Sequence, residues 1–200
     1  MAVFIPTYFS PISQYRAIVN AEIVLFEIED NFQKQSYRNR CYIFNTNGKQ
    51  LLNIPVKHPV TSGRKKTKDT IIENATNWQD QHFKSLKTAY RNSPFFEFYI
   101  DDLTPIFEKK YKFLQDLNFD TFDFITDALQ LEIDYKKSES YIELEEKFDF
   151  RNLADAKFTP NILTNNYIQM FDDKHGFIPN LSILDLLFME GPNTISFLEN

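Results

Sequence analysis

Cysteine and glycine are both scarce in this chain, and each shortage excludes classes of protein. Cys41 is the one cysteine among 200 residues, so no disulfide can form within the chain and no zinc site can be built from several thiolates. With four glycines, Gly-rich loops are missing too: there is no dinucleotide-binding fingerprint, no P-loop and no G-x-S-x-G elbow. Dehydrogenases, P-loop kinases and serine hydrolases are therefore disfavoured.

Long apolar runs and metal motifs are missing as well. No stretch approaches the roughly 18 consecutive apolar residues of a membrane span, and the opening residues do not resemble a secretory signal. We therefore expect a cytoplasmic protein without a membrane span. The three histidines lie too far apart to form a recognisable metal motif, and we expect neither a metal nor a cofactor.

The chain is rich in phenylalanine. It contains 21 Phe and 10 Tyr but one Trp, which indicates a core built largely on Phe, and Cys41 is expected inside that core rather than as a nucleophile. The length suits one domain. We expect a single domain over residues 1–200, sheet-rich over 1–76 and helix-rich over 77–200.

The N-terminal part predicts the mixed sheet of an α/β fold. A helix between two apolar strands forms a βαβ unit, which favours a parallel pair, and an Asn-Gly pair between two further strands is typical of a tight hairpin. The expected elements are a strand at 3–5, a helix at 11–20, a strand at 23–26, a hairpin of 41–44 and 51–56 around Asn47-Gly48, and a short strand at 70–72.

The C-terminal half is mainly helical by the spacing of its apolar residues. Ser or Thr followed by Pro is typical of a helix start. Residues 134–165 are charged and only weakly patterned. The expected helices run from Trp78 to Tyr90, from Ser93-Pro94, from Thr104-Pro105 through Leu114, from Thr121 to Leu131, and over 181–188.

Charge is distributed unevenly along the chain. The net charge is −6, which makes nucleic acid an unlikely partner. Residues 33–68, which we call the basic strip, nevertheless contain no Asp or Glu and nine basic residues: Lys34, Arg38, Arg40, Lys49, Lys57, Arg64, Lys65, Lys66 and Lys68. Acidic residues dominate from Glu97 to Asp155, so a local positive field on an acidic body is expected.

The basic strip predicts a site for a small anionic substrate, such as a nucleotide or a sugar phosphate. Arginine offers a planar fork that matches phosphate, and lysine adds a point charge. In this interpretation the phosphate is held by Lys34, Arg38, Arg40 and Lys57. The sugar is oriented by Glu29, Asp30, Gln33 and Asn39. An equally open alternative is a solvated basic face whose arginines pair with acidic residues. The candidate substrate-binding residues are Tyr8, Glu29, Gln33, Lys34, Ser36, Tyr37, Arg38, Asn39, Arg40 and Lys57.

Three residues are candidates for proton transfer. His58 ends the predicted hairpin strand and leads into a Lys-rich loop, and His82 lies one turn after Trp78 on a predicted helix. Asp30 follows a strand of the βαβ unit, where ligands commonly bind. Each has a structural alternative: an exposed loop for His58, a satisfied interfacial histidine for His82, and an ion pair with Lys34 or Arg38 for Asp30.

Several ordered motifs resemble the WbqC-like protein family. They are Pro6-Thr7-Tyr8-Phe9-Ser10-Pro11, Gln33-Lys34-Gln35-Ser36-Tyr37-Arg38-Asn39-Arg40, Ile54-Pro55-Val56-Lys57, Ser93-Pro94-Phe95-Phe96, and the closing segment from Gly176 to Phe188. The resemblance implies a bacterial or archaeal protein connected with surface polysaccharides. It also implies a transferase that adds an acyl or aminoacyl group to a nucleotide-linked amino sugar. Phe4-Ile5-Pro6 stands where the family commonly has His-Gln-Pro, so that histidine has no counterpart here.

Two functions follow from these observations. The first is a transferase of surface-polysaccharide or cell-envelope glycan synthesis. The second is a non-enzymatic module that recognises a glycan, a nucleic acid or a partner protein through the basic strip, with Phe95, Phe96 and Tyr99 as an exposed aromatic platform. An enclosed cavity favours the enzyme, and a flat basic face favours the module. The oligomeric state stays open.

Overall fold

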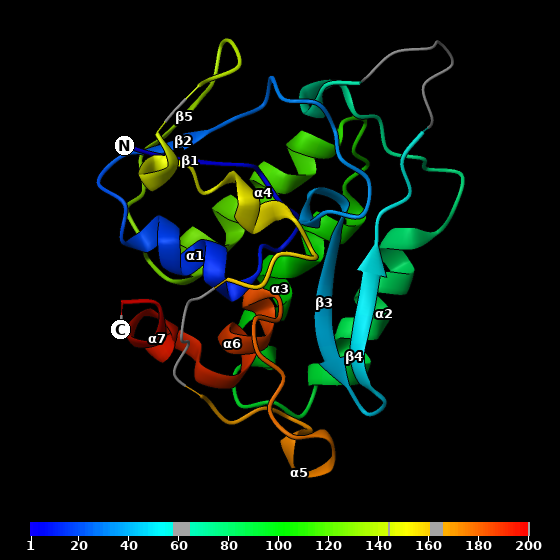
Figure 1. Ribbon diagram of the computed structural model, residues 1–200. Coiled ribbons are helices and arrows are strands. Elements are labelled where there is room, and N and C mark those ends of the chain that lie inside the picture. Colours follow the sequence, from blue (N-terminus) through cyan, green and yellow to red (C-terminus); the bar gives the residue numbers. More distant parts are fainter. Residues whose placement is uncertain (58–64, 144, 161–165, 200) are drawn as a thin grey trace.

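The computed structural model describes residues 1–57, 65–143, 145–160 and 166–199 and confirms an α/β fold (Figure 1). Strand β1 (Ala2–Phe4), helix α1 (Ile12–Val19) and strand β2 (Val24–Phe26) form the expected βαβ unit. The two strands are parallel, with Ala2 beside Val24 and Phe4 beside Phe26.

A third parallel strand joins this sheet from much later in the chain. Strand β5 (Tyr135–Lys137) pairs with β2, which gives the order β1-β2-β5. This strand lies in the weakly patterned part of the sequence. It was not predicted, because Tyr-Lys-Lys has no apolar alternation of the kind that indicates a strand.

The predicted hairpin is present as a separate two-stranded sheet. Strands β3 (Arg40–Asn45) and β4 (Gly48–Asn53) are antiparallel, and Asn45 faces Gly48 across the turn. The strand predicted at 70–72 is wrong. Ile71 and Ile72 make one isolated bridge each, to Phe113 and Val56, so they do not form a continuous ladder.

Three long helices build the centre of the molecule: α2 (Trp78–Tyr90), α3 (Phe96–Glu108) and α4 (Leu114–Ala128). Helix α4 lies behind the parallel sheet in Figure 1. Its Phe119 and Phe122 pack edge-on against Phe26 of β2, with ring centroids 5.4 and 5.1 Å apart. The Phe-rich composition thus fills the space between sheet and helix.

The helix start predicted at Thr104-Pro105 is wrong. Pro105 lies inside α3. The Thr104 hydroxyl donates to the Ile100 carbonyl one turn earlier, at 2.7 Å, instead of capping a new helix. The helix predicted to begin at Thr121 begins seven residues earlier, at Leu114.

The C-terminal part adds helices α5 (Asp172–His175), α6 (Ile183–Glu190) and α7 (Thr194–Glu199). Helix α6 is apolar and buried from Ile183 to Phe188. Ser182 caps it and accepts from the Leu184 amide. In the described part of the chain no helix combines the length and apolar character needed to cross a membrane.

Candidate functional site

A cavity of about 700 Å³ opens at the carboxyl ends of β1 and β2. Ile5, which directly follows β1, and Asp30, which follows β2, contribute to its lining. This is the edge at which parallel α/β sheets commonly bind ligands. Among the described residues, the other walls come from residues 31–34 and Arg38, from Val56, Lys57, Lys65 and Thr70, and from Tyr141, Asp149, Arg151, Asn152, Asp155 and Phe158.

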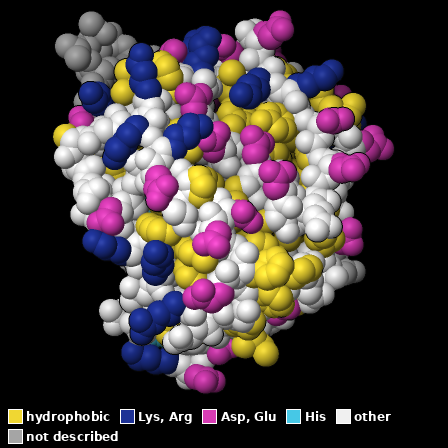
Figure 2. Space-filling model, turned by 180° about the vertical axis from the view of Figure 1, so that it is seen from behind, with side chains coloured by type: hydrophobic (Ala, Val, Ile, Leu, Met, Phe, Trp, Pro, Cys, Tyr) yellow, Lys and Arg dark blue, Asp and Glu magenta, His cyan; other side chains and the backbone are white. Residues whose placement is uncertain are grey.

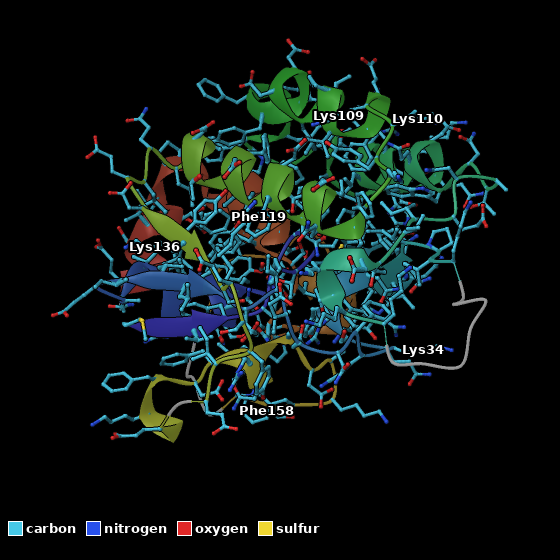
Figure 3. The ribbon with its side chains drawn as sticks, turned by 90° about the horizontal axis from the view of Figure 1, so that it is seen from above. Lys34, Lys109, Lys110, Phe119, Lys136 and Phe158 are labelled. Atoms are coloured by element: carbon cyan, nitrogen blue, oxygen red, sulfur yellow. The ribbon has the colours of Figure 1, made fainter. Side chains whose placement is uncertain are left out.

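Backbone contacts hold the 141–158 segment against the N-terminal part. Val3 and Asp149 form a parallel bridge, and the Phe150 amide donates to the Val3 carbonyl at 2.9 Å. Ser36 and Asp155 form an antiparallel bridge. The side chains of Lys34 and Phe158 consequently lie on the same side of the molecule (Figure 3).

An ion pair is buried in the cavity wall. Arg38 Nη2 donates to Asp30 Oδ2, and Arg38 Nε donates to the Thr67 hydroxyl at 3.3 Å. Arg38 is 3% exposed. Its burial lowers the pKa of the guanidinium, and Asp30 opposes that shift. Asp30 therefore forms the ion pair with Arg38 that was its structural alternative, through one of its two carboxylate oxygens.

The second oxygen of Asp30 is unsatisfied. Asp30 Oδ1 is buried and accepts no hydrogen bond from any described residue. Because an unsatisfied buried carboxylate oxygen is costly and Asp30 lines the cavity, this oxygen is a candidate acceptor for a ligand hydroxyl or amine.

Three lysines supply free positive charge around the cavity. Lys34, Lys57 and Lys65 all line it, and within the described ranges none of them has an acidic side chain at ion-pair distance. Lys34 and Lys57 are exposed, whereas partial burial lowers the pKa of Lys65. The Phe32 amide donates to the Lys65 carbonyl at 2.7 Å, which joins the two walls that carry Lys34 and Lys65.

Arg151 is a cavity residue that the sequence did not point to. Its Nε and Nη2 donate to the two carboxylate oxygens of Asp149, at 2.8 and 2.6 Å, and its Nη1 donates to the Ile142 carbonyl. The hydrogen bonds that Arg151 donates to Asp149 raise the pKa of Arg151. The sequence signal for this pair is the spacing Asp149-Phe150-Arg151, because an arginine two residues after an aspartate can reach both of its carboxylate oxygens.

Two predicted site residues lie in the core instead. The Tyr8 hydroxyl is 3.1 Å from His82 Nδ1, and both side chains are buried. Neither residue lines the cavity. His82 is therefore the satisfied interfacial histidine that the structural alternative described, with Tyr8 as its partner.

Part of the basic strip also has structural partners. The Ser36 hydroxyl donates to the Gln33 carbonyl at 2.7 Å, and Asn39 donates to the Ile54 carbonyl at 2.9 Å. Tyr37 is buried, which raises its pKa to about 12. Arg40 begins β3 and is half-buried.

Glu29 is held by two lysines of the strip. Lys66 and Lys68 both donate to its carboxylate and lower its pKa. The cavity therefore collects five of the predicted residues: Asp30, Gln33, Lys34, Arg38 and Lys57. His58 lies outside the described residues.

The model of the WbqC-like protein family matches residues 6–157. The chain belongs to this family. The matched range includes the basic strip and the cavity segment up to Lys157, and it ends before the closing motif at 176–188. No curated protein and no solved structure matches the chain.

Proposed function

We propose that this WbqC-like protein is a transferase of surface-polysaccharide or cell-envelope glycan synthesis. Its cavity would bind an anionic substrate, either a nucleotide sugar or a sugar phosphate. The observation that carries the proposal is the convergence of Lys34, Lys57 and Lys65, none of them in an ion pair with a described residue, on a cavity at the carboxyl ends of parallel strands.

The charge balance of the cavity supports an anionic ligand. Five basic and three acidic side chains line it. Two of the basic ones, Arg38 and Arg151, are each paired with an aspartate of the lining. The charges of the lining that are not in these two pairs are those of three lysines and of Asp155. The local field is therefore positive, although the whole chain carries −6.

The group-transfer step needs a proton acceptor, and we propose Asp30, which lines the cavity, for that role. Its Oδ1, which accepts no hydrogen bond within the described residues, would take the proton from the acceptor amine or hydroxyl as that group attacks the acyl carbon of the donor. The electron pair of the broken bond leaves with the donor's leaving group. His58 remains an alternative proton carrier. His82 is buried in the core and takes no part in this step.

Geometry favours the enzyme over the binding module. The free lysines surround a cavity rather than a flat face, and the proposed aromatic platform is wrong because Phe96 and Tyr99 are buried at 2% and 3% exposure. On the opposite side of the molecule, acidic and basic side chains are both scattered over the surface (Figure 2).

Calorimetric titration with a panel of nucleotide sugars and sugar 1-phosphates tests the proposal. Lys34→Ala/Lys57→Ala should weaken binding tenfold or more, because each charged contact contributes about 1.5–3 kcal/mol. The matched control is Lys84→Ala/Lys87→Ala, which removes the same charge from α2. If the wild type binds nothing in the panel, or both double variants bind equally well, the proposal is refuted.

A further inference from the structure

Most aromatic side chains in the described part of the chain are buried or half-buried, and few are exposed. In the described part of the chain the strongly exposed aromatic residues are Phe98, Tyr141, Phe148 and Phe158. Two of these four, Tyr141 and Phe158, line the cavity with the lysines. They are 56% and 39% exposed, so neither ring is used to fill the core.

We propose that Tyr141 and Phe158 form a stacking subsite for a planar heterocyclic base, which makes the cavity ligand a nucleotide. The inference rests on the proposed function and decides between its two classes of substrate. Stacking a base on an aromatic face is favourable and tolerant of base identity, since every base presents a π-face.

A guanidinium contacts the Tyr141 ring, and a hydrogen bond fixes the backbone at Phe158. Arg151 lies over the Tyr141 ring, 5.0 Å from its centroid, and Arg151 is itself fixed by its fork on Asp149. The Phe158 amide donates to the Asp155 carbonyl at 3.1 Å, in the turn that follows the Ser36–Asp155 bridge. Pre-positioned aromatic side chains lose little conformational entropy when a ligand binds.

The two walls of the cavity supply the two halves of a nucleotide site. The rings of Tyr141 and Phe158 come from the late segment, and the free lysines come from the basic strip. Figure 3 shows Lys34 and Phe158 on the same side but separated along it. The amides of Asn31 and Asn152 also line the cavity and can donate to and accept from a base edge. A volume of about 700 Å³ lies within the usual range for small-molecule sites.

A sugar ring can also lie against an aromatic face, so the test must separate the two sources. The ligands are a series of nucleoside diphosphates, inorganic pyrophosphate and a hexose 1-phosphate, titrated calorimetrically. The variants are Tyr141→Ala, Phe158→Ala and Phe158→Trp. Phe98→Ala and Phe148→Ala remove exposed rings that do not line the cavity and serve as matched controls.

We expect nucleoside diphosphates to bind more tightly than pyrophosphate. Tyr141→Ala and Phe158→Ala should each weaken nucleoside diphosphate binding about tenfold and change pyrophosphate binding less than twofold. Phe158→Trp should retain the affinity, and the control variants should behave as wild type.

Three results would overturn the inference, and they are distinguishable. If pyrophosphate and nucleoside diphosphates bind equally and the ring variants have no effect, the base subsite is refuted while the anionic site stands. If the ring variants weaken hexose 1-phosphate but not nucleoside diphosphates, the rings hold a sugar. If the wild type binds no anion at all, the proposed function falls with the inference.

Discussion

The hydroxyl of Tyr8 lies 3.1 Å from Nδ1 of His82, and the pair is sealed in the core beside Trp78. Burial lowers the pKa of His82 to about 4, against an opposing hydrogen bond with the Asn53 backbone. The imidazole is therefore neutral at physiological pH, which suits a structural partner of Tyr8 better than a proton carrier.

This histidine should make stability fall at acidic pH. Its pKa is lower in the folded than in the unfolded chain, so its contribution is complete above pH 6.5 and is lost as the pH falls toward 4. The loss amounts to about 3 kcal/mol. Urea unfolding of wild type and His82→Asn across this range measures it, and a wild type-to-variant difference that does not change with pH would contradict it.

Asp185 should have the opposite effect. Tyr90, Tyr167 and Gln169 donate to its carboxylate, yet complete burial raises its pKa to about 6. Its folded pKa is above the unfolded one, so its contribution is complete below about pH 4 and is lost as the pH rises through 6.

The Asp185→Asn variant isolates this contribution. Unfolding by urea should show the wild type losing about 3 kcal/mol relative to the variant between pH 4 and 7. His82 and Asp185 change the stability with pH in opposite directions, so their effects largely cancel in the wild type. Each single variant therefore reveals the pH dependence that the other residue causes. Parallel pH profiles for the two variants would exclude both assignments.

Breaking the Arg38–Asp30 pair should destabilise the protein strongly. Arg38→Met leaves the Asp30 carboxylate buried without its cation, which costs about 3–5 kcal/mol. Adding Asp30→Asn to Arg38→Met should recover part of that loss, since the uncompensated charge is removed. Denaturant unfolding of the two single variants and the double variant forms a double-mutant cycle, in which simple additivity would show that the pair is not coupled.

Two phenylalanines in the first turn of α3 provide a matched pair for the core. Phe96 is 2% exposed and packs against Phe188 of α6, whereas Phe98 is 75% exposed. Phe96→Ala should cost about 3–5 kcal/mol, and Phe98→Ala should stay within about 0.5 kcal/mol of wild type. Thermal denaturation of both variants decides the matter, and similar melting temperatures would be inconsistent with this packing.

Sequence reasoning succeeded where local chemistry determines structure. Ser10-Pro11, the Asn47-Gly48 pair between two apolar strands and the apolar spacing of α2 all gave elements close to those observed. It failed at Thr104-Pro105, because a Ser/Thr-Pro pair indicates a helix start only when tertiary packing does not carry the helix through it.

The candidate site was predicted in part for the same reason. Asp30, Gln33 and Lys34 follow a recognisable strand, so their place at its end could be expected. The contribution of residues 141–158 could not, because it depends on backbone pairing between Ser36 and Asp155 that no local pattern encodes. The ion pair of Arg38 with Asp30 was one of the alternatives considered, but the burial of Arg38 was not predicted, since a basic residue in a charged stretch is usually exposed.

The order β1-β2-β5 has a consequence for how the chain folds over time. Strand β2 acquires its second neighbour only after α2, α3 and α4 have been synthesised, and the segment that carries Tyr141 and Phe158 follows later still. Pairings between residues so distant in sequence form slowly, because the loop between them must close first. During translation the hairpin and the long helices can therefore fold early, whereas the capacity to bind a ligand should be among the last properties the nascent chain acquires.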